Sequence, residues 1–226
     1  MKVCYTALFG DYEDLKEPTV ITPGWSYICF TDQPLKSNVW EIREVDTFGL
    51  GDDLQKLARY FKIMEWVDWE QSMWVDASFS IQVNLDWWWS QYFDKGFSVP
   101  IHPRRNCVYD EIDACVGTRG DIATLMEQRQ EYQQRGIPKK DGIITSGIIM
   151  RDNRPEVIEL CQKWWDELKT RSNRDQVAFA AIQNNFKHLI NLYQWDYTRQ
   201  THFIYHKHYK YRTIHNSSMP LPRNIV

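Results

Sequence analysis

Long apolar runs are missing from the 226-residue sequence. None approaches the roughly 20 residues with which a helix spans a bilayer. The N-terminal residues enter a strand-like pattern directly, without the apolar stretch and cleavage site of a signal peptide. We therefore expect a cytoplasmic protein without a membrane span.

Cysteines are few and do not form pairs along the chain. The five, Cys4, Cys29, Cys107, Cys115 and Cys161, are an odd number, and no two are spaced as CxxC. This pattern argues against a disulfide framework and against a structural zinc site. We expect reduced thiols, in agreement with a cytoplasmic location.

The sequence also lacks a strong charge imbalance and the familiar short motifs. It has 27 Lys and Arg against 30 Asp and Glu, a net charge of -3, so nothing favours nucleic acid or an anionic membrane as a partner. There is no GxGxxG, GxxxxGK[ST], GxSxG or HExxH motif. A Ser-His-Asp hydrolase is therefore not supported, and any anion site must be local.

What remains is the composition of a globular protein, with 43% hydrophobic and 25% charged residues. No repeat, low-complexity tract or linker is visible, so we expect one domain over residues 1–226. Hydrophobic periodicity predicts strands at 3–9, 25–30, 40–45, 97–101 and 143–150, and helices at 52–69, 86–93, from 122 to 136, at 153–168 and from 172.

The stretch from Met73 to Ile81 is an apolar, strand-like run that carries one carboxylate, Asp76, and the hydroxyls of Ser78 and Ser80. Ligands of open α/β sheets bind outside the carboxyl ends of the strands, so Asp76 is a candidate site residue. The alternative is that Asp76 only caps the next segment or starts a turn.

Two cations, Arg59 and Lys62, lie three residues apart on the polar side of the helix predicted for 52–69. Like charges at this spacing repel by a few tenths of a kcal/mol, unless an anion lies near them. The pair therefore indicates either an anion site or a solvated helix surface.

A second basic group follows the strand predicted for 97–101. Pro103 keeps His102 out of the helical conformation, so a loop presents His102 with Arg104 and Arg105. Arginine pairs suit bidentate contacts with phosphate or carboxylate. The alternatives are a solvated basic turn and a structural network with the acidic residues at 110, 111 and 113.

Further candidates lie later in the chain. Thr145-Ser146-Gly147 interrupts an apolar run with small residues, as a bulge or a close approach to a ligand does. Asp175 falls in the first turn of a helix, where capping would also explain it. In the tail, alternation places His202, His206 and His208 on one side of a strand, and one of them could bind a metal.

Together, seven segments resemble in their order a glycosyltransferase-like family of plant and microbial proteins, first described as a domain of unknown function and related to enzymes of cell-wall mucilage synthesis. The segments are Tyr5 to Tyr12, Cys29 to Asp32, Ala58 to Lys62, Trp74 to Ser78, His102 to Cys107, Thr145 to Ile149 and Arg174 to Gln176. The resemblance is clearest over residues 3–185, and we expect residues 186–226 to close the site.

This resemblance implies a single GT-A (Rossmann-like) domain of the α/β class, with a mixed, mostly parallel central sheet flanked by helices. It implies transfer of a sugar from a nucleotide-diphosphate sugar, with a UDP-sugar as the expected donor, to a glycan or other hydroxyl acceptor in polysaccharide biosynthesis. The expected cofactor is Mn²⁺ or Mg²⁺, which the family holds with an Asp-x-Asp motif. Here Ser78 replaces the second acid, so a C-terminal histidine is expected to complete the site.

The resemblance also assigns roles to residues. The catalytic set is Asp175, Arg59 and Lys62, and the metal ligands are Asp76, Ser78, His206 and His208. The nucleotide sugar is expected against Thr6, Ala7, Phe9, Asp11, Tyr12, Asp32, Arg59, Lys62, Val75, Asp76, Ala77 and Ser78. The transferred sugar or the acceptor is expected against His102, Arg104, Arg105, Thr145, Ser146, Gly147, Arg174 and Gln176.

Two other functions remain open from the sequence. One is a metal-dependent hydrolase that uses the same pocket, because the second acid is missing. The other is a non-catalytic module that binds carbohydrate or polyanions through the run Trp87-Trp88-Trp89 and the basic tail.

Overall fold

A computed structural model describes residues 1–11, 13–47, 53–116, 121–196, 199 and 201–206. Within these residues the central sheet has seven strands in the order β3-β2-β1-β4-β7-β6-β8. All are parallel except β7, which runs antiparallel to both of its neighbours. The strands are β1 Lys2–Leu8, β2 Trp25–Thr31, β3 Glu41–Glu44, β4 Gln71–Val75, β6 Phe97–Pro100, β7 Ile148–Asp152 and β8 Ile190–Tyr193. This confirms the mixed, mostly parallel sheet.

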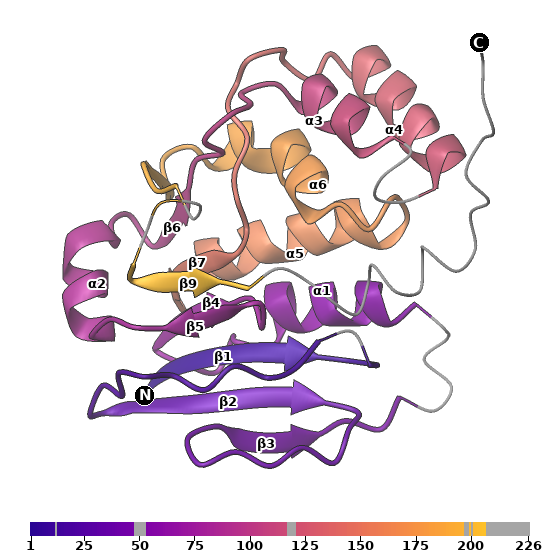
Figure 1. Cartoon of the computed structure of the whole chain (residues 1–226). Coiled ribbons are helices and arrows are strands. Elements are labelled where there is room, and N and C mark those ends of the chain that lie inside the picture. Colours follow the sequence, from indigo (N-terminus) through magenta and orange to yellow (C-terminus); the bar gives the residue numbers. More distant parts are fainter. Residues whose placement is uncertain (12, 48–52, 117–120, 197–198, 200, 207–226) are drawn as a thin grey trace, which may run out of the picture.

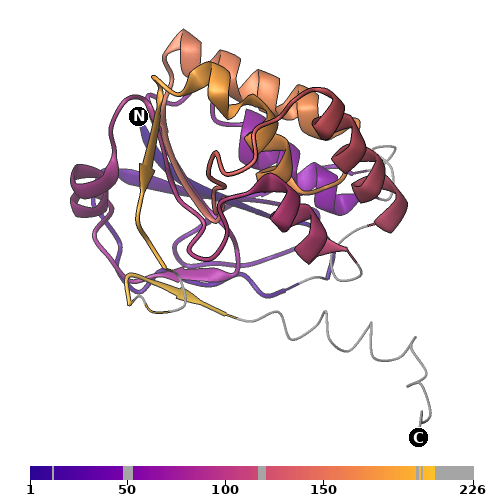
Figure 2. The same cartoon turned by 90° about the horizontal axis from the view of Figure 1, so that it is seen from above.

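Helices cover the sheet on one face and a mixed layer covers it on the other (Figures 1 and 2). The first face carries α1 Leu54–Met64, α5 Pro155–Lys169 and α6 Asp175–Ile182, followed by the 3-10 helix η1 Gln183–Phe186. The second carries α2 Leu85–Tyr92 and a small antiparallel pair, β5 Phe79–Ile81 and β9 Phe203–Tyr205. Two further helices, α3 Val108–Cys115 and α4 Ile122–Gln134, pack beside α6.

The first strand shows why the sheet lies between two layers. Val3 and Tyr5 pack into the cluster under α1 and α5, whereas Cys4 and Leu8 pack into the cluster on the opposite face. Successive side chains of a strand point to opposite faces, so an apolar strand must be covered on both sides. The sequence of β1 therefore specifies a central position.

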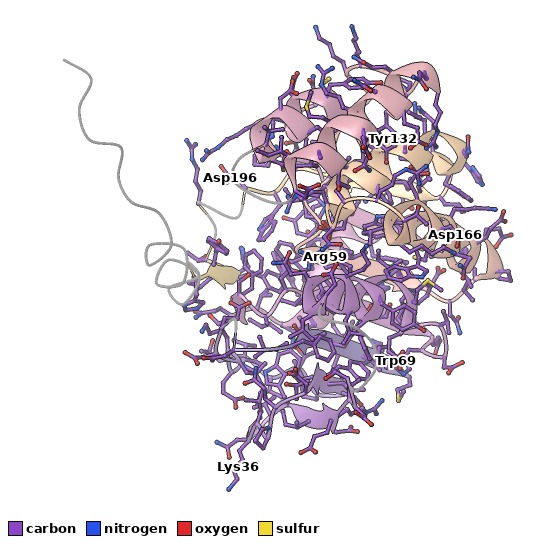
Figure 3. All side chains as sticks on the ribbon, turned by 90° about the vertical axis from the view of Figure 1, so that its right-hand side faces the viewer. Lys36, Arg59, Trp69, Tyr132, Asp166 and Asp196 are labelled. Atoms are coloured by element: carbon purple, nitrogen blue, oxygen red, sulfur yellow. The ribbon has the colours of Figure 1, made fainter. Side chains whose placement is uncertain are left out.

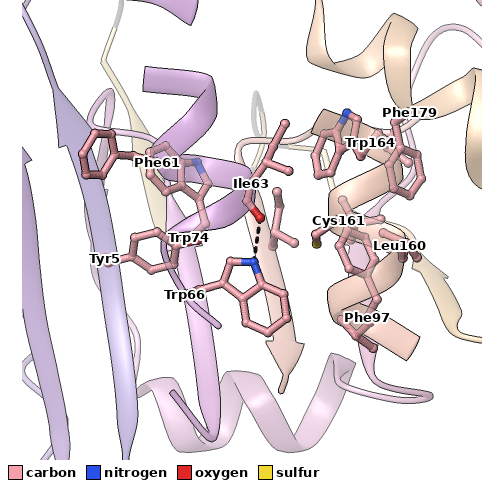
Figure 4. Packing of buried hydrophobic residues seen from close by; sticks show 14 of the residues in the cluster. Tyr5, Phe61, Ile63, Trp66, Trp74, Phe97, Leu160, Cys161, Trp164 and Phe179 are labelled. Carbon is pink, nitrogen blue, oxygen red and sulfur yellow. Dashed lines mark hydrogen bonds between the residues drawn. The ribbon is translucent and has the colours of Figure 1, made fainter. Parts of the chain in front are cut away.

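Tryptophan fills much of this interior. Trp66, Trp74, Trp88 and Trp164 are at most 2% exposed, and Figure 4 shows three of them between α1, α5 and the sheet. Burial of such large rings stabilises the core. The high aromatic content is thus mainly a matter of packing.

Helix α1 begins as predicted, because the Asp53 side chain accepts a hydrogen bond from the Lys56 N–H at 2.9 Å. The prediction that the helix reaches Trp69 is wrong, since it ends at Met64. The Lys62 carbonyl instead accepts hydrogen bonds from the Tyr5 hydroxyl and from Arg151. The Ile63 carbonyl accepts one from the Trp66 indole at 2.7 Å (Figure 4). Side chains therefore bind the carbonyls at which the helix stops.

Two apolar runs of the sequence contain breaks. The run 73–81 divides into β4 and β5 around a turn in which the Phe79 N–H bonds the Asp76 carbonyl. The strand predicted for 143–150 starts only at Ile148; Ile144 before it forms a single bridge with Ile101. The interruption predicted at residues 145–147 is thus a complete break, and it lies directly beside Asp76.

Replacement of Phe97 by alanine tests the packing of the core. Its ring is fully buried, stacks on Phe179 with centroids 5.4 Å apart, and meets Trp164 edge-on. We expect Phe97→Ala to lower the free energy of unfolding in urea by about 3–5 kcal/mol. The exposed Met126, as Met126→Ala, should change it by less than about 0.5 kcal/mol. Equal effects of the two changes would contradict this description of the core.

Candidate functional site

The side chain of Lys62 lies at the centre of the site. It is 1% exposed, and its Nζ lies 2.9 Å from Asp76 Oδ1, 2.9 Å from Asp175 Oδ2 and 3.4 Å from Ser146 Oγ. A buried ammonium group is stable only when its charge is compensated, and here two carboxylates compensate it. We call Lys62, Asp76, Ser146 and Asp175 the Lys62 cluster.

Asp76 enters the cluster from the carboxyl end of β4, where the sequence predicted a strand tip. Its Oδ1 also accepts a hydrogen bond from the Trp74 indole at 2.6 Å, and its N–H donates to the Gly147 carbonyl at 2.8 Å. The side chain is 34% exposed, so this carboxylate reaches the surface. A Cβ on Gly147 would lie 2.9 Å from the Phe79 ring and 3.6 Å from Asp76 Oδ2, which explains why this position needs glycine.

Asp175 is the first residue of α6 and is 3% exposed. Ser146 Oγ donates to its Oδ2 at 2.7 Å, and its Oδ1 accepts from the Gln176 N–H at 3.0 Å. Burial alone would raise the pKa of Asp175, but the charges of Lys62, Arg59 and Arg174 hold that pKa well below its ordinary value. Asp175 therefore supports its helix start with one oxygen and the Lys62 cluster with the other.

Arg59 lies one turn before Lys62 on α1, with a side chain that is 25% exposed. Its Nε is 3.4 Å from Asp175 Oδ2, and this Nε has no hydrogen-bond partner among the described residues. Figure 3 shows Arg59 in the middle of the molecule, between the sheet and the upper helices. Of the two cations predicted on this helix, the side chain of Lys62 is buried and that of Arg59 is partly exposed.

The loop after β6 forms a network of its own around the buried Glu111. Arg105 Nε lies 2.5 Å from Glu111 Oε2, and Arg174 Nη2 lies 3.4 Å from Glu111 Oε1. Burial and the nearby arginines, Arg105 first, lower the pKa of His102, whose Nδ1 accepts from the N–H groups of Arg104 and Arg105. The alternative of a structural network is thus observed for Arg105, while the side chain of Arg104 is exposed.

This network adjoins the Lys62 cluster. Arg174 precedes Asp175 in the chain and donates to Gln176 Oε1 at 2.9 Å, and Gln176 Nε2 donates to the Ile144 carbonyl at 2.8 Å. Thr145 is buried beside it, and its N–H bonds the Pro100 carbonyl. The structure therefore brings most of the residues predicted for the acceptor side into one region.

The residues predicted for the nucleotide lie along β1, β2 and β4. Thr6, Ala7 and Phe9 are buried, and Phe9 packs on Phe61 with ring centroids 5.2 Å apart. Asp32 Oδ1 accepts from the Gly10 N–H at 2.9 Å, which ties the carboxyl ends of β1 and β2 together. Val75, Ala77 and Ser78 are buried, Asp11 is exposed, and Tyr12 lies outside the described residues.

The predicted metal ligands do not form a metal site in the described part of the chain. There, no group of three His, Cys, Asp or Glu residues is arranged to hold a metal ion. Asp76 Oδ1 is occupied by Lys62 and Trp74, and His206 Nε2 lies 3.0 Å from Ser80 Oγ. These residues do not fit a divalent cation, and Mn²⁺ or Mg²⁺ stays a prediction that depends on His208, which is not among the described residues.

Two contributors were not predicted from the sequence. Trp74 orients Asp76, and Arg151 bonds the backbone of Lys62. Trp74 had a local signal, because it lies two residues before Asp76 and so on the same side of the strand. Arg151 lies 89 residues from Lys62 in the chain, and no local pattern connects the two.

The fold and the Lys62 cluster define an α/β protein with a polar site at the carboxyl end of its central strands. A family model described as "TOD1/MUCI70, glycosyltransferase-like domain" matches residues 55–209, so the chain belongs to this family. The match confirms the predicted family, although it begins later and extends further than residues 3–185. No curated protein matches the chain.

Among solved structures, the chain is similar to the apo form of WbbM, a bifunctional glycosyltransferase. The TM-score is 0.50 at 10% sequence identity, over 85% of this chain and 38% of the WbbM chain. The likeness shows a shared fold, and the chain corresponds to well under half of the larger protein. Within the described residues, no helix has the length and apolar character needed to cross a membrane.

The charge of Asp175 should make stability depend on pH. Because its folded pKa lies below the unfolded value of about 3.9, its contribution is present above that value and is lost as the pH falls toward the folded pKa. We expect Asp175→Asn to lower the free energy of unfolding in urea by about 3 kcal/mol at pH 7, since it removes one of the two carboxylates that compensate the buried Lys62. The difference from the wild type should shrink below about pH 4.

The matched control is Asp113→Asn, which removes an exposed carboxylate that pairs with Arg129. It should change the free energy of unfolding by less than about 1 kcal/mol at either pH. A difference for Asp175→Asn that stays constant or grows in acid would show that this carboxylate is not held in its charged form by the cluster.

Proposed function

We propose that the chain transfers a glycosyl group from a nucleotide-diphosphate sugar, first of all a UDP-sugar, to a hydroxyl group of a glycan or another acceptor. The family and the fold support glycosyl transfer as the class of reaction. The observation that carries the finer proposal is the Lys62 cluster together with Arg59, which gathers two cations and two carboxylates at the carboxyl end of β4. Ligands of open α/β sheets bind at this edge.

In this proposal the donor extends along the edge from β2 to β4. The base and ribose lie near the ends of β1 and β2, where Asp32 closes the turn at Gly10. The diphosphate lies toward Arg59, whose guanidinium group is partly open and suits bidentate contact with phosphate oxygens. The acceptor approaches from the side of Ser146 and Gln176.

The chemistry assigns separate roles to the charged groups. Transfer breaks the bond between the anomeric carbon and the phosphate oxygen, which keeps the electron pair, and the acceptor oxygen bonds the same carbon as its hydroxyl loses the proton. Cations fixed near the phosphate stabilise the developing negative charge, the role we assign to Arg59 and Lys62. The low pKa of Asp175 makes it a weak base. We therefore assign Asp175 to orienting the two cations.

The aromatic run gives little support to the alternative of a non-catalytic binding module. Trp88 is fully buried and Trp89 stacks on Phe93 with ring centroids 4.0 Å apart, so two of the three rings serve packing. The hydrolase alternative shares the Lys62 cluster and differs in the substrate. Turnover of an amide or phosphoester without any sugar donor would favour it.

Removal of the Asp76 charge tests the proposed function. We expect Asp76→Asn to lower the release of UDP from the best substrate among a panel of UDP-sugars by about 100-fold or more, because Asp76 positions Lys62 beside the donor. The measurement is nucleotide release with and without glycan acceptors. Asp113→Asn, on the exposed side of α3, should leave the rate within about twofold.

Acceptor-dependent release in the wild type identifies transfer, and release that does not depend on the acceptor identifies hydrolysis of the donor. Turnover by Asp76→Asn at the wild-type rate would show that the reaction takes place elsewhere. A wild type without turnover or binding of any nucleotide sugar would contradict the proposed donor.

A further inference from the structure

The ammonium group of Lys62 lies directly beside Asp76, the residue expected from the resemblance to hold the metal ion. Its three neighbours are Asp76 Oδ1, Asp175 Oδ2 and Ser146 Oγ, at 2.9, 2.9 and 3.4 Å. Lys62 Nζ donates hydrogen bonds to Asp175 and Ser146 and forms an ion pair with Asp76. Two carboxylates and a hydroxyl are also the hard oxygen ligands that Mn²⁺ or Mg²⁺ would use.

The surroundings of Asp76 disfavour a second cation there. Its Oδ1 already binds the Lys62 ammonium and the Trp74 indole. A divalent ion on the remaining oxygen would lie next to the positive charge of Lys62, which is 1% exposed and little screened by water. Ser78, where a second carboxylate would be needed, is neutral and buried.

The four charged side chains joined through Lys62 and Asp175 balance one another without a metal. Lys62 and Arg59 carry two positive charges, and Asp76 and Asp175 carry two negative ones. Asp175 Oδ2 lies 2.7 Å from Ser146 Oγ and 2.9 Å from Lys62 Nζ, whereas Arg59 Nε is more distant, at 3.4 Å. The terminal nitrogens of Arg59 make no hydrogen bond or closer ion pair within the described residues, and they can turn to a phosphate.

We infer that Lys62 is the resident cation of this site and that Arg59 binds the diphosphate of the donor, so that the donor binds without a divalent metal. The inference rests on the proposed function, because it concerns how the same donor is held. It replaces the metal expected from the family resemblance with two side chains of α1.

The first experiment separates donor binding from metal binding. We expect UDP at about 1 mM to raise the Tm by about 3 °C or more, and by the same amount with EDTA as with MnCl₂. Arg59→Met should abolish this shift, and Arg59→Lys should restore part of it as a single charge. The control is Arg129→Met, which removes an arginine that also pairs with one carboxylate, Asp113, and should keep the full shift.

The second experiment asks where Mn²⁺ binds, by the loss of the EPR signal of free Mn²⁺ without nucleotide. The wild type and Asp76→Asn should bind the same amount, because Asp76 is occupied by Lys62. Lys62→Ala should gain one Mn²⁺ site, since it leaves Asp76, Asp175 and Ser146 facing an empty position. Lys62→Ala with Asp175→Asn should lose that site again.

The outcomes distinguish this inference from the proposed function. A UDP shift that requires MnCl₂, or Mn²⁺ binding in the wild type that Asp76→Asn removes, overturns the metal-free site and leaves the proposed donor intact. Absence of a UDP shift under both conditions overturns the use of a UDP-sugar and this inference with it. The wild-type and Asp76→Asn measurements decide the question even where Lys62→Ala does not fold.

Discussion

The contact of one buried ammonium group with two carboxylates joins the elements on which the site depends. Lys62 belongs to α1, Asp76 to the end of β4 and Asp175 to the start of α6. Removal of Lys62 would leave the buried Asp175 without its closest cation, and removal of either carboxylate would leave Lys62 with one compensating charge instead of two; breaking such buried pairs costs several kcal/mol in protein interiors. The positions of α1 and α6 relative to the sheet are therefore fixed by the same charges that we assign to the reaction.

The antiparallel strand makes this arrangement possible. Parallel strands all begin at the end of the sheet that lies opposite their carboxyl ends. A parallel neighbour of β4 would therefore begin far from Asp76. Because β7 runs antiparallel to β4, with Val75 opposite Ile148, its entry brings Ser146 and Gly147 to the end of β4. One reversed strand in the described sheet thus places a hydroxyl donor beside Asp175 and Lys62.

The sequence predicts the parts of this structure that local rules govern. Alternating and continuous apolar runs identify β1, β2 and β6, Asp53 identifies the start of α1, and a strand tip identifies Asp76. The partners of Lys62 lie 14 and 113 residues away in the chain, and no periodicity connects them. The end of α1 differs from the prediction for the same reason, because side chains of β1 and β7 bind the carbonyl of Lys62.

Behind Lys62, the structure contains a second buried cation that secures the first. Arg151 is fully buried, has no carboxylate partner among the described residues, and lies 4.7 Å from the Trp66 ring centre. It and Tyr5 bond the Lys62 carbonyl in the last turn of α1, where the helix dipole favours a positive charge. The backbone of Lys62 is thus held from the core while its side chain is held by the carboxylates. Because both its backbone and its ammonium group are held, Lys62 needs little reorganisation when negative charge develops beside it. Such preorganised cations lower the barrier of reactions that develop negative charge, as the proposed transfer does.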